Sequence, residues 1–319
     1  SGTYAPGIKN YSYLVKQTGF EKISKLIGIP FHGELPAAIE LYGRIASGEE
    51  IPEYSEPTDG ARRYHPVQNL PKSLRAEVFK GWFDFDIQAS APTLVYQHAC
   101  KIRQRLEPTS TKEFIPAIAR LVSDRAEVRK YVGELTGLNE KTVKQILIAL
   151  FFGSKLVPNK QRAIFRILNC DYEMLERLKK EAYISEFCRN VELMWMYVIN
   201  NDNKEKGMAV FRGESKPIQK PSTKAKHRMA IYLKLERTVI DVVESELLSK
   251  DVVPVLIHDG FMTKVQVDKS ALEEAINNKT GYVVRLSESI VGNSTLEDAV
   301  KMSDEMINLI NEDLRIDNL

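Results

Sequence analysis

Two aspartates stand at the ends of apolar runs in the sequence. Asp86 closes the run FDFDI, and Asp259 lies in VPVLIHDGFMTKVQV, where a His-Asp-Gly triplet separates two apolar stretches. A partly buried carboxylate is costly unless something holds its charge, and two carboxylates at one point repel each other unless a cation lies between them. Oxygen ligands suit Mg²⁺, which keeps coordination positions open for water or phosphate. If the two segments are neighbouring strands, they form a site for two Mg²⁺ ions and in-line phosphoryl transfer.

A basic and aromatic stripe accompanies the acidic pair. The segment 139–156 has the pattern of a helix in which residues at three- or four-residue steps share one face: Lys141, Lys144, Ile148, Phe152 and Lys155. Such lysines are usually only solvated. Two lysines followed by an aliphatic and an aromatic residue would also suit a nucleoside triphosphate, with the lysines at the phosphates and Phe152 near the base.

The elements that must position these residues are mostly helical. We expect helices through most of 108–206, with Asn139 as an N-cap and one long helix or two in 172–199. A helix over 228–248, the hairpin around Asp259, a short helix near 270–278, a strand over 281–286 and a helical C-terminus should follow. Few strands among many helices predict an α+β fold with a small antiparallel sheet.

The composition sets limits on the cellular setting and the partners. Three cysteines in 319 residues have neither metal-ligand spacing nor the number for a disulfide framework, which indicates a reducing, cytoplasmic setting. No membrane span or signal peptide is expected. With a net charge of +2, affinity for nucleic acid must come from a local patch. Residues 204–228 carry eight Lys or Arg against two Glu; this basic loop either contacts nucleic acid or is a solvated linker.

Four short segments resemble motifs of the single-subunit phage and mitochondrial RNA polymerases. IHDGF resembles motif C, and KQILIALFFGSK resembles motif B, since Lys144 precedes Phe152 and Gly153 by the family spacing. DIQASAP resembles motif A, and DGARRY weakly resembles an Asp-x-x-Gly-Arg motif, with Arg62 where Gly is expected. The motifs follow the family order over roughly residues 58–290, and DNA polymerase I shares this palm.

The resemblance implies a right-hand polymerase fold with a small antiparallel palm sheet and helical fingers. Residues 1–60 would form a reduced, thumb-like helical segment, and 61–105 the first part of the palm with motif A. Residues 106–206 would form the fingers with motif B, and 207–319 the basic loop and the second part of the palm with motif C. The family's RNA polymerases are more than twice as long, so autonomous promoter recognition and a proofreading exonuclease are not expected.

The resemblance also implies roles for individual residues. Asp86, Asp259 and the backbone carbonyl of Ile87 would hold two Mg²⁺ ions, for which Mn²⁺ can substitute, unless Asp84 is the true ligand; Asp84 is otherwise the partner of a nearby arginine. Lys144 would bind the triphosphate and protonate pyrophosphate, and His258 would lie beside the nascent 3′ end. Further nucleotide-binding residues would be Lys141, Phe152, Gly153, Ala91 and Arg228. Contacts to nucleic acid would come from Arg62, Arg63, Lys216, Lys220 and Lys224.

Two positions bear on the choice of sugar. The DNA-polymerase relatives place a Glu five residues after the motif A Asp, where it blocks a 2′-hydroxyl; here that residue is Ala91, or Ala89 if Asp84 is the ligand. A ribonucleotide therefore fits. The family's RNA polymerases have Tyr in place of Phe152, so we expect efficient use of NTPs with only modest discrimination against dNTPs.

The sequence therefore predicts a template-directed nucleotidyltransferase that makes RNA on DNA, as a minimal RNA polymerase or a primase. Its partners would be a DNA template, NTPs and nascent RNA, and a second subunit or a single-stranded-DNA-binding protein is a further expectation. A small family-A-like DNA polymerase, half of a heterodimeric polymerase, a non-catalytic palm subunit and an HD-type metal phosphohydrolase stay open as alternatives. Expression in a bacterial cell, from the host or a virus, fits this prediction, and a mitochondrial setting stays open.

Overall fold

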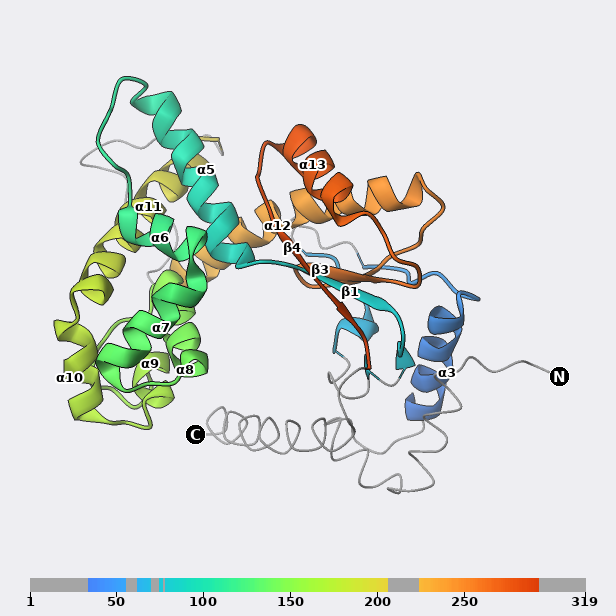
Figure 1. The fold of residues 1–319 in the computed structure, drawn as a ribbon, viewed down its shortest axis with the longest axis horizontal. Helices are drawn as coiled ribbons and strands as arrows, with labels where there is room; N and C mark the ends of the chain where they lie inside the picture. Colours follow the sequence, from blue (N-terminus) through green and yellow to red (C-terminus); the bar gives the residue numbers. More distant parts are fainter. Residues whose placement is uncertain (1–33, 56–61, 70–74, 77, 206–223, 293–319) are drawn as a thin grey trace. The chain divides into compact units, whose positions relative to one another are not determined.

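The computed structural model describes residues 34–55, 62–69, 75–76, 78–205 and 224–292 (Figure 1). The chain forms two compact units. The first comprises residues 1–87, 240–279 and 285–319, and the second comprises 88–239 and 280–284. The predicted α+β class with a small antiparallel sheet is confirmed, because one four-stranded antiparallel sheet accompanies many helices.

The sheet of the first unit has the strand order β2-β3-β1-β4. Its strands are β1 (Phe83–Ile87), β2 (Val255–Ile257), β3 (Gly260–Thr263) and β4 (Leu286–Ile290). β1 lies between β3 and β4 and is antiparallel to both. The two acid-bearing segments are therefore neighbouring strands, which is the condition on which the proposed metal site depends. The strand β1, which lies inside the sheet, carries Asp84 and Asp86.

Alternation along the strands gives the sheet two different faces. Val255, Ile257 and Met262 pack with helix α3 (Glu34–Ser47), the 3-10 helix η1 (Pro66–Asn69) and Trp82 in one hydrophobic cluster. On the other face, Phe85 and Phe261 are completely buried and their rings stack 4.9 Å apart. Helix α13 (Lys269–Thr280) is connected to β4 through Glu273, which accepts a hydrogen bond from the Leu286 amide.

The second unit is helical. It contains α5 (Ser90–Leu106), α6 (Pro116–Ser123), α7 (Arg125–Thr136), α8 (Glu140–Phe151), α9 (Ala163–Ile167), α10 (Tyr172–Lys180) and α11 (Ala182–Glu205). Helix α12 (Lys224–Leu248) contributes residues to both units. Trp195 of α11 is completely buried and donates a 2.7 Å hydrogen bond to the carbonyl of Phe151, so α11 and α8 are joined in the core.

Several predicted boundaries are corrected. The segment 281–285 is not a strand: the side-chain amide of Gln97 bonds to both the N–H and the C=O of Val283, in place of a neighbouring strand. Of the two possibilities expected for 172–199, one long helix or two, the structure shows two, because Glu181 is extended and its carboxylate caps α11 at the Ile184 amide. Helix α8 ends at Phe151, and both ends of the expected basic loop are helical, since α11 reaches Glu205 and α12 begins at Lys224. The expected C-terminal helix lies outside the described residues.

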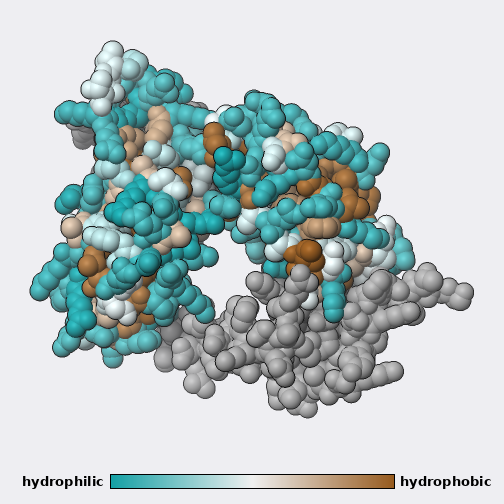
Figure 2. Space-filling model, viewed as in Figure 1, coloured by the Kyte–Doolittle hydropathy of each residue, from teal (hydrophilic) through white to brown (hydrophobic). Residues whose placement is uncertain are grey.

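Hydrophilic residues cover most of the described part of the face in Figure 2. Among the described residues, every helix is too short or too polar to cross a bilayer.

Candidate active site

The β1–β3 pairing brings Asp86 and Asp259 to one corner of the sheet. Asp86 lies directly opposite Gly260, the residue that follows Asp259. The Ile87 amide, next to Asp86, donates a 3.1 Å hydrogen bond to the carbonyl of Asp259. Two backbones at hydrogen-bonding distance hold the two carboxylate-bearing residues together, although they are far apart in the sequence.

Gly260 permits this close approach. A Cβ at this position would clash with the carbonyl oxygen of Phe85 and would lie 3.2 Å from Oδ1 of Asp86. The turn that precedes it is also constrained, because His258 has a φ of 54°, in the left-handed region that few residues other than glycine adopt. The His-Asp pair thus lies in a hairpin turn, whereas the phosphohydrolase alternative requires it on a helix.

Asp84 and Asp86 share the electrostatic environment of Arg75. Burial lowers the pKa of the Arg75 guanidinium, and the negative charges of Asp84 and Asp86 act in the opposite direction. The alternative of an arginine partner for Asp84 therefore has a concrete candidate. Asp86 is exposed, while Asp84 and Asp259 are half-buried. Asp86 is consequently the more accessible carboxylate of β1.

The corner fits a Mg²⁺ site in its chemistry. It offers carboxylate oxygens from Asp86 and Asp259, and these hard ligands are the ones Mg²⁺ prefers. Among the described residues no three His, Cys, Asp or Glu side chains form a metal-binding group. A two-carboxylate site suits a metal ion that takes its other ligands from backbone carbonyls, water and substrate phosphates. Ile87, predicted to supply a carbonyl, is buried at the same corner.

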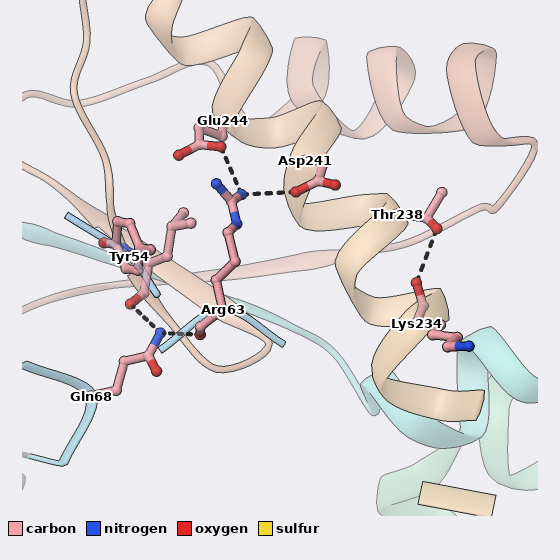
Figure 3. A network of polar contacts seen from close by, with 8 residues as sticks. Tyr54, Arg63, Gln68, Lys234, Thr238, Asp241 and Glu244 are labelled. Carbon is pink, nitrogen blue, oxygen red and sulfur yellow. Dashed lines mark hydrogen bonds and ion pairs between the residues drawn. The ribbon is translucent and has the colours of Figure 1, made fainter. Parts of the chain in front are cut away.

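Arg62 and Arg63, both predicted to contact nucleic acid, have different surroundings. Arg62 Nη1 lies 2.8 Å from Nδ1 of His258, so this arginine belongs to the acidic corner. Arg63 forms ion pairs with Asp241 at 2.8 Å and Glu244 at 2.7 Å, both on α12 (Figure 3). The charge of Arg63 is therefore already offset within the first unit.

The predicted triphosphate-binding stripe lies on the exposed side of α8. The side chain of Asn139 caps the helix by accepting a 2.8 Å hydrogen bond from the Thr142 amide, as predicted. Lys141 and Lys144 are exposed on this helix. Phe152 is its C-cap residue, and Lys155 lies beyond the helix, so the stripe is one lysine shorter than expected.

Gly153 and Arg228 are in direct contact in the second unit. Gly153 has a φ of 99°, and a Cβ there would clash with Nη1 of Arg228. Arg228 is 4% exposed; its Nη2 donates to the Glu192 carboxylate at 3.1 Å. Its Nε and Nη1 are buried without a hydrogen-bond partner, which is costly for a charged group. An anion at Nε and Nη1 would supply the missing hydrogen-bond acceptors.

A phenol that was not predicted from the sequence lies beside Phe152. The ring of Tyr232, on α12, lies 5.9 Å from the Phe152 ring, and its hydroxyl donates a 3.1 Å hydrogen bond to Ser90 Oγ. Ser90 precedes Ala91, and both are buried. No local motif marks Tyr232, because only the packing of α12 brings it to these residues.

The predicted residues therefore fall into two groups. The first unit holds Asp86, Asp259, His258 and Arg62 together, and the second holds Phe152, Gly153 and Arg228 together. Lys216 and Lys220 of the basic loop lie outside the described residues, and Lys224 is the first residue of α12.

The comparisons with known proteins give a structural likeness without a sequence relative. No family model matches the sequence, and no curated protein is significantly similar to it. Among solved structures, the chain is similar to the POL domain of Pol1 from M. smegmatis in complex with DNA primer-template and dNTP, with a TM-score of 0.46 and 10% identity. The match covers 89% of this chain and 55% of that chain, so this chain spans about half the length of that protein. A similarity of this level assigns no role to any individual residue.

Proposed function

We propose that the protein is a template-directed nucleotidyltransferase that uses two Mg²⁺ ions. The observation that carries this proposal is the register of β1 and β3, which places Asp86 opposite Gly260, beside Asp259. These are the two carboxylates that the motif A and motif C resemblance names as metal ligands. The two carboxylates meet at one corner because of the tertiary structure, so this geometry supports the proposal independently of the sequence resemblance.

In the proposed reaction, the first unit supplies the acidic ligands. Asp86, Asp259 and the Ile87 carbonyl would hold Mg²⁺, or Mn²⁺ in its place. Metal ions bound there would activate the attacking hydroxyl and neutralise charge on the phosphates. His258 would contact the nascent 3′ end, and Arg62 would act at this corner by binding His258.

The second unit supplies the nucleotide-binding residues in this proposal. Lys144 would contact the phosphates and protonate the departing pyrophosphate, and Lys141 would add positive charge one turn nearer the start of α8. Phe152 would stack near the base. Arg228, with two buried nitrogens that make no hydrogen bond, would take an anionic part of the nucleotide.

The proposed product is RNA made on a DNA template. Ala91 leaves room for a 2′-hydroxyl, which a longer acidic side chain would block. Primer synthesis and transcription both fit, and contact of the basic loop with the template, through Lys216, Lys220 and Lys224, is part of the proposal. A second candidate is a small DNA polymerase, favoured by Phe152, which lacks the phenol of the RNA-polymerase motif.

The deciding experiment is nucleotide incorporation by the purified chain. Labelled NTPs or dNTPs are offered with Mg²⁺ on a primed DNA template and on unprimed single-stranded DNA, with EDTA as the control. Metal-dependent extension with NTPs supports the RNA-synthesis proposal, and products without a primer show initiation de novo, which both a primase and an RNA polymerase perform. Extension with dNTPs alone supports the second candidate. No incorporation under any condition, with or without an added single-stranded-DNA-binding protein, contradicts both.

A further inference from the structure

The contact between Arg62 and His258 determines which nitrogen of the histidine carries a hydrogen. Arg62 Nη1 lies 2.8 Å from His258 Nδ1, within hydrogen-bonding distance. A guanidinium can only donate hydrogen bonds and stays charged in proteins. Nδ1 must therefore accept through its lone pair, which requires a neutral imidazole with its hydrogen on Nε2.

The segment that carries Arg62 is fixed on several sides. Ser55 and Tyr64 form a β-bridge with backbone hydrogen bonds of 2.8 and 3.3 Å. Arg63 is paired with Asp241 and Glu244 on α12, and its guanidinium lies 5.8 Å from the centre of the Tyr54 ring (Figure 3). Arg62 is therefore attached to α12 through its neighbour in the chain.

The same segment is also connected to the strand that leads into the His258 turn. Gln68 Nε2 donates to the carbonyls of Arg63 and Leu256, each at 3.2 Å. The Leu256 amide donates a 2.7 Å hydrogen bond to the hydroxyl of Tyr54. Leu256 belongs to β2, which ends at Ile257, immediately before His258. Arg62 and the turn thus share one hydrogen-bonded frame, which keeps the arginine in register with the imidazole.

We propose that Arg62 is a positioning residue that holds His258 as a neutral Nε2–H donor, directed to an acceptor oxygen of the nucleic-acid strand whose 3′ end reacts beside Asp259. The destination of that donor rests on the proposed function, whereas the tautomer follows from the Arg62 contact. In the protein without nucleic acid, the hydrogen is on Nε2 whichever group accepts a hydrogen bond from it.

The first test is the tautomer itself, read by ¹⁵N NMR of protein labelled at its five histidines. His258 should show a protonated Nε2 and an unprotonated Nδ1. His65 provides an internal reference for the same tautomer, because its Nδ1 accepts a 3.1 Å hydrogen bond from the Val67 amide. A His258 spectrum with hydrogen on Nδ1, or on both nitrogens, at neutral pH would overturn the proposal. This measurement needs no enzyme activity, so it separates failure of this proposal from failure of the proposed function.

The variants Arg62→Met and Arg62→Lys test the role of the donor in the same spectra. Met keeps most of the side-chain length without a hydrogen, and Lys restores a donor. We expect His258 to lose its single tautomer in Arg62→Met and to regain it in Arg62→Lys, while the His65 signals stay unchanged in both. An unchanged His258 spectrum in a folded Arg62→Met protein would contradict the proposal. If Arg62→Met does not fold, the wild-type and Arg62→Lys spectra decide.

The second test uses primer extension. The side-chain amide of Gln reaches approximately the Nε2 position, whereas that of Asn is nearer Nδ1. His258→Gln should therefore keep more activity than His258→Asn, by about tenfold if one hydrogen bond is at stake. Arg62→Met should lower kcat about tenfold without raising KM for nucleotide, and Arg62→Lys should recover most of it. Equal loss in His258→Gln and His258→Asn would contradict a donor role at Nε2.

Discussion

The acidic corner of the first unit and the basic face of α8 in the second are built by different means. In the corner, Asp86 and Asp259 come from segments far apart in the sequence, and the β1–β3 backbone pairing sets their positions. On α8, Lys141 and Lys144 are exposed, and the helix that carries them is capped locally by Asn139. Substitutions in the corner that touch the backbone should therefore affect both chemistry and fold. Substitutions of the exposed lysines on α8 should affect the reaction with nucleotide and leave the fold unchanged.

The largest expected effect is the loss of a corner carboxylate. Asp86→Asn and Asp259→Asn should each reduce primer extension more than a hundredfold, about 3 kcal/mol or more, because a metal ligand acts on the charge of the transition state. The measurement is kcat/KM with Mg²⁺, together with thermal unfolding to show that the fold is kept.

Asp84→Asn is the matched control, since Asp84 is on the same strand and faces Arg75 together with Asp86. We expect a much smaller loss from it. An active Asp259→Asn enzyme would disprove the metal-site assignment. If Asp84→Asn is inactive and Asp86→Asn is not, Asp84 is the ligand and the sugar-facing position moves to Ala89.

The second effect concerns two glycines, one from each region. Gly260→Ala should destabilise the protein by about 3 kcal/mol or more, because the new methyl group meets the backbone carbonyl of Phe85, which cannot move without breaking the sheet. Gly153→Ala should cost less, about 1–2 kcal/mol, because its clash is with the side chain of Arg228 and part of the cost is left-handed strain. Urea unfolding measures both.

Gly137→Ala is a control that separates the cost of left-handed backbone strain from the cost of a clash with a neighbouring atom. Gly137 has a φ of 77° at the end of α7, and a Cβ there would meet nothing within 4 Å. Its cost is the strain alone, and the excess of Gly153→Ala over it reports the Arg228 contact. If Gly260→Ala and Gly137→Ala lowered the unfolding free energy equally, β1 and β3 would not approach each other at Gly260 as closely as the structure shows.

The third effect is on nucleotide binding. Lys144→Ala should raise KM for nucleotide and lower kcat, by about tenfold in kcat/KM, because the lysine would contact charge that grows as pyrophosphate leaves. Lys141→Ala should do less. Because both lysines are exposed, neither change should alter the free energy of unfolding by more than about 0.5 kcal/mol. Equal and negligible kinetic effects would show that this side of α8 does not bind the nucleotide.

The smallest effect is on the choice of sugar. Phe152→Tyr adds a phenol next to the Tyr232 ring and the Arg228 contact at Gly153, and should raise the preference for ATP over dATP a few-fold if its hydroxyl finds a partner. Ala91→Glu should lower ATP use more than dATP use. Because Ala91 is buried, the unfolding free energy of Ala91→Glu must be measured as well. A wild-type enzyme that strongly prefers dATP would favour the DNA-polymerase candidate.

The helical parts of the molecule follow closely from local sequence. Asn139 caps α8 as predicted, and the helices of 108–206 are present, because caps and apolar periodicity act within a few residues. The predicted secondary structure is wrong where a residue distant in the sequence supplies the backbone's hydrogen bonds. Gln97 bonds to Val283 and prevents the expected strand over 281–286, and no periodicity in that segment records this.

The sequence by itself determined the residue types and the order of the acidic and basic motifs, and the two apolar runs around Asp259 were enough to predict a hairpin. Only the tertiary structure decided which atoms meet. The β1–β3 register set Asp86 opposite Gly260, the packing of α12 brought Tyr232 to Phe152, and the frame around Arg63 placed Arg62 on His258. The physical reason is that hydrogen bonds and side-chain packing act over a few ångströms in space, and the chain separation of these pairs leaves no trace in local sequence pattern.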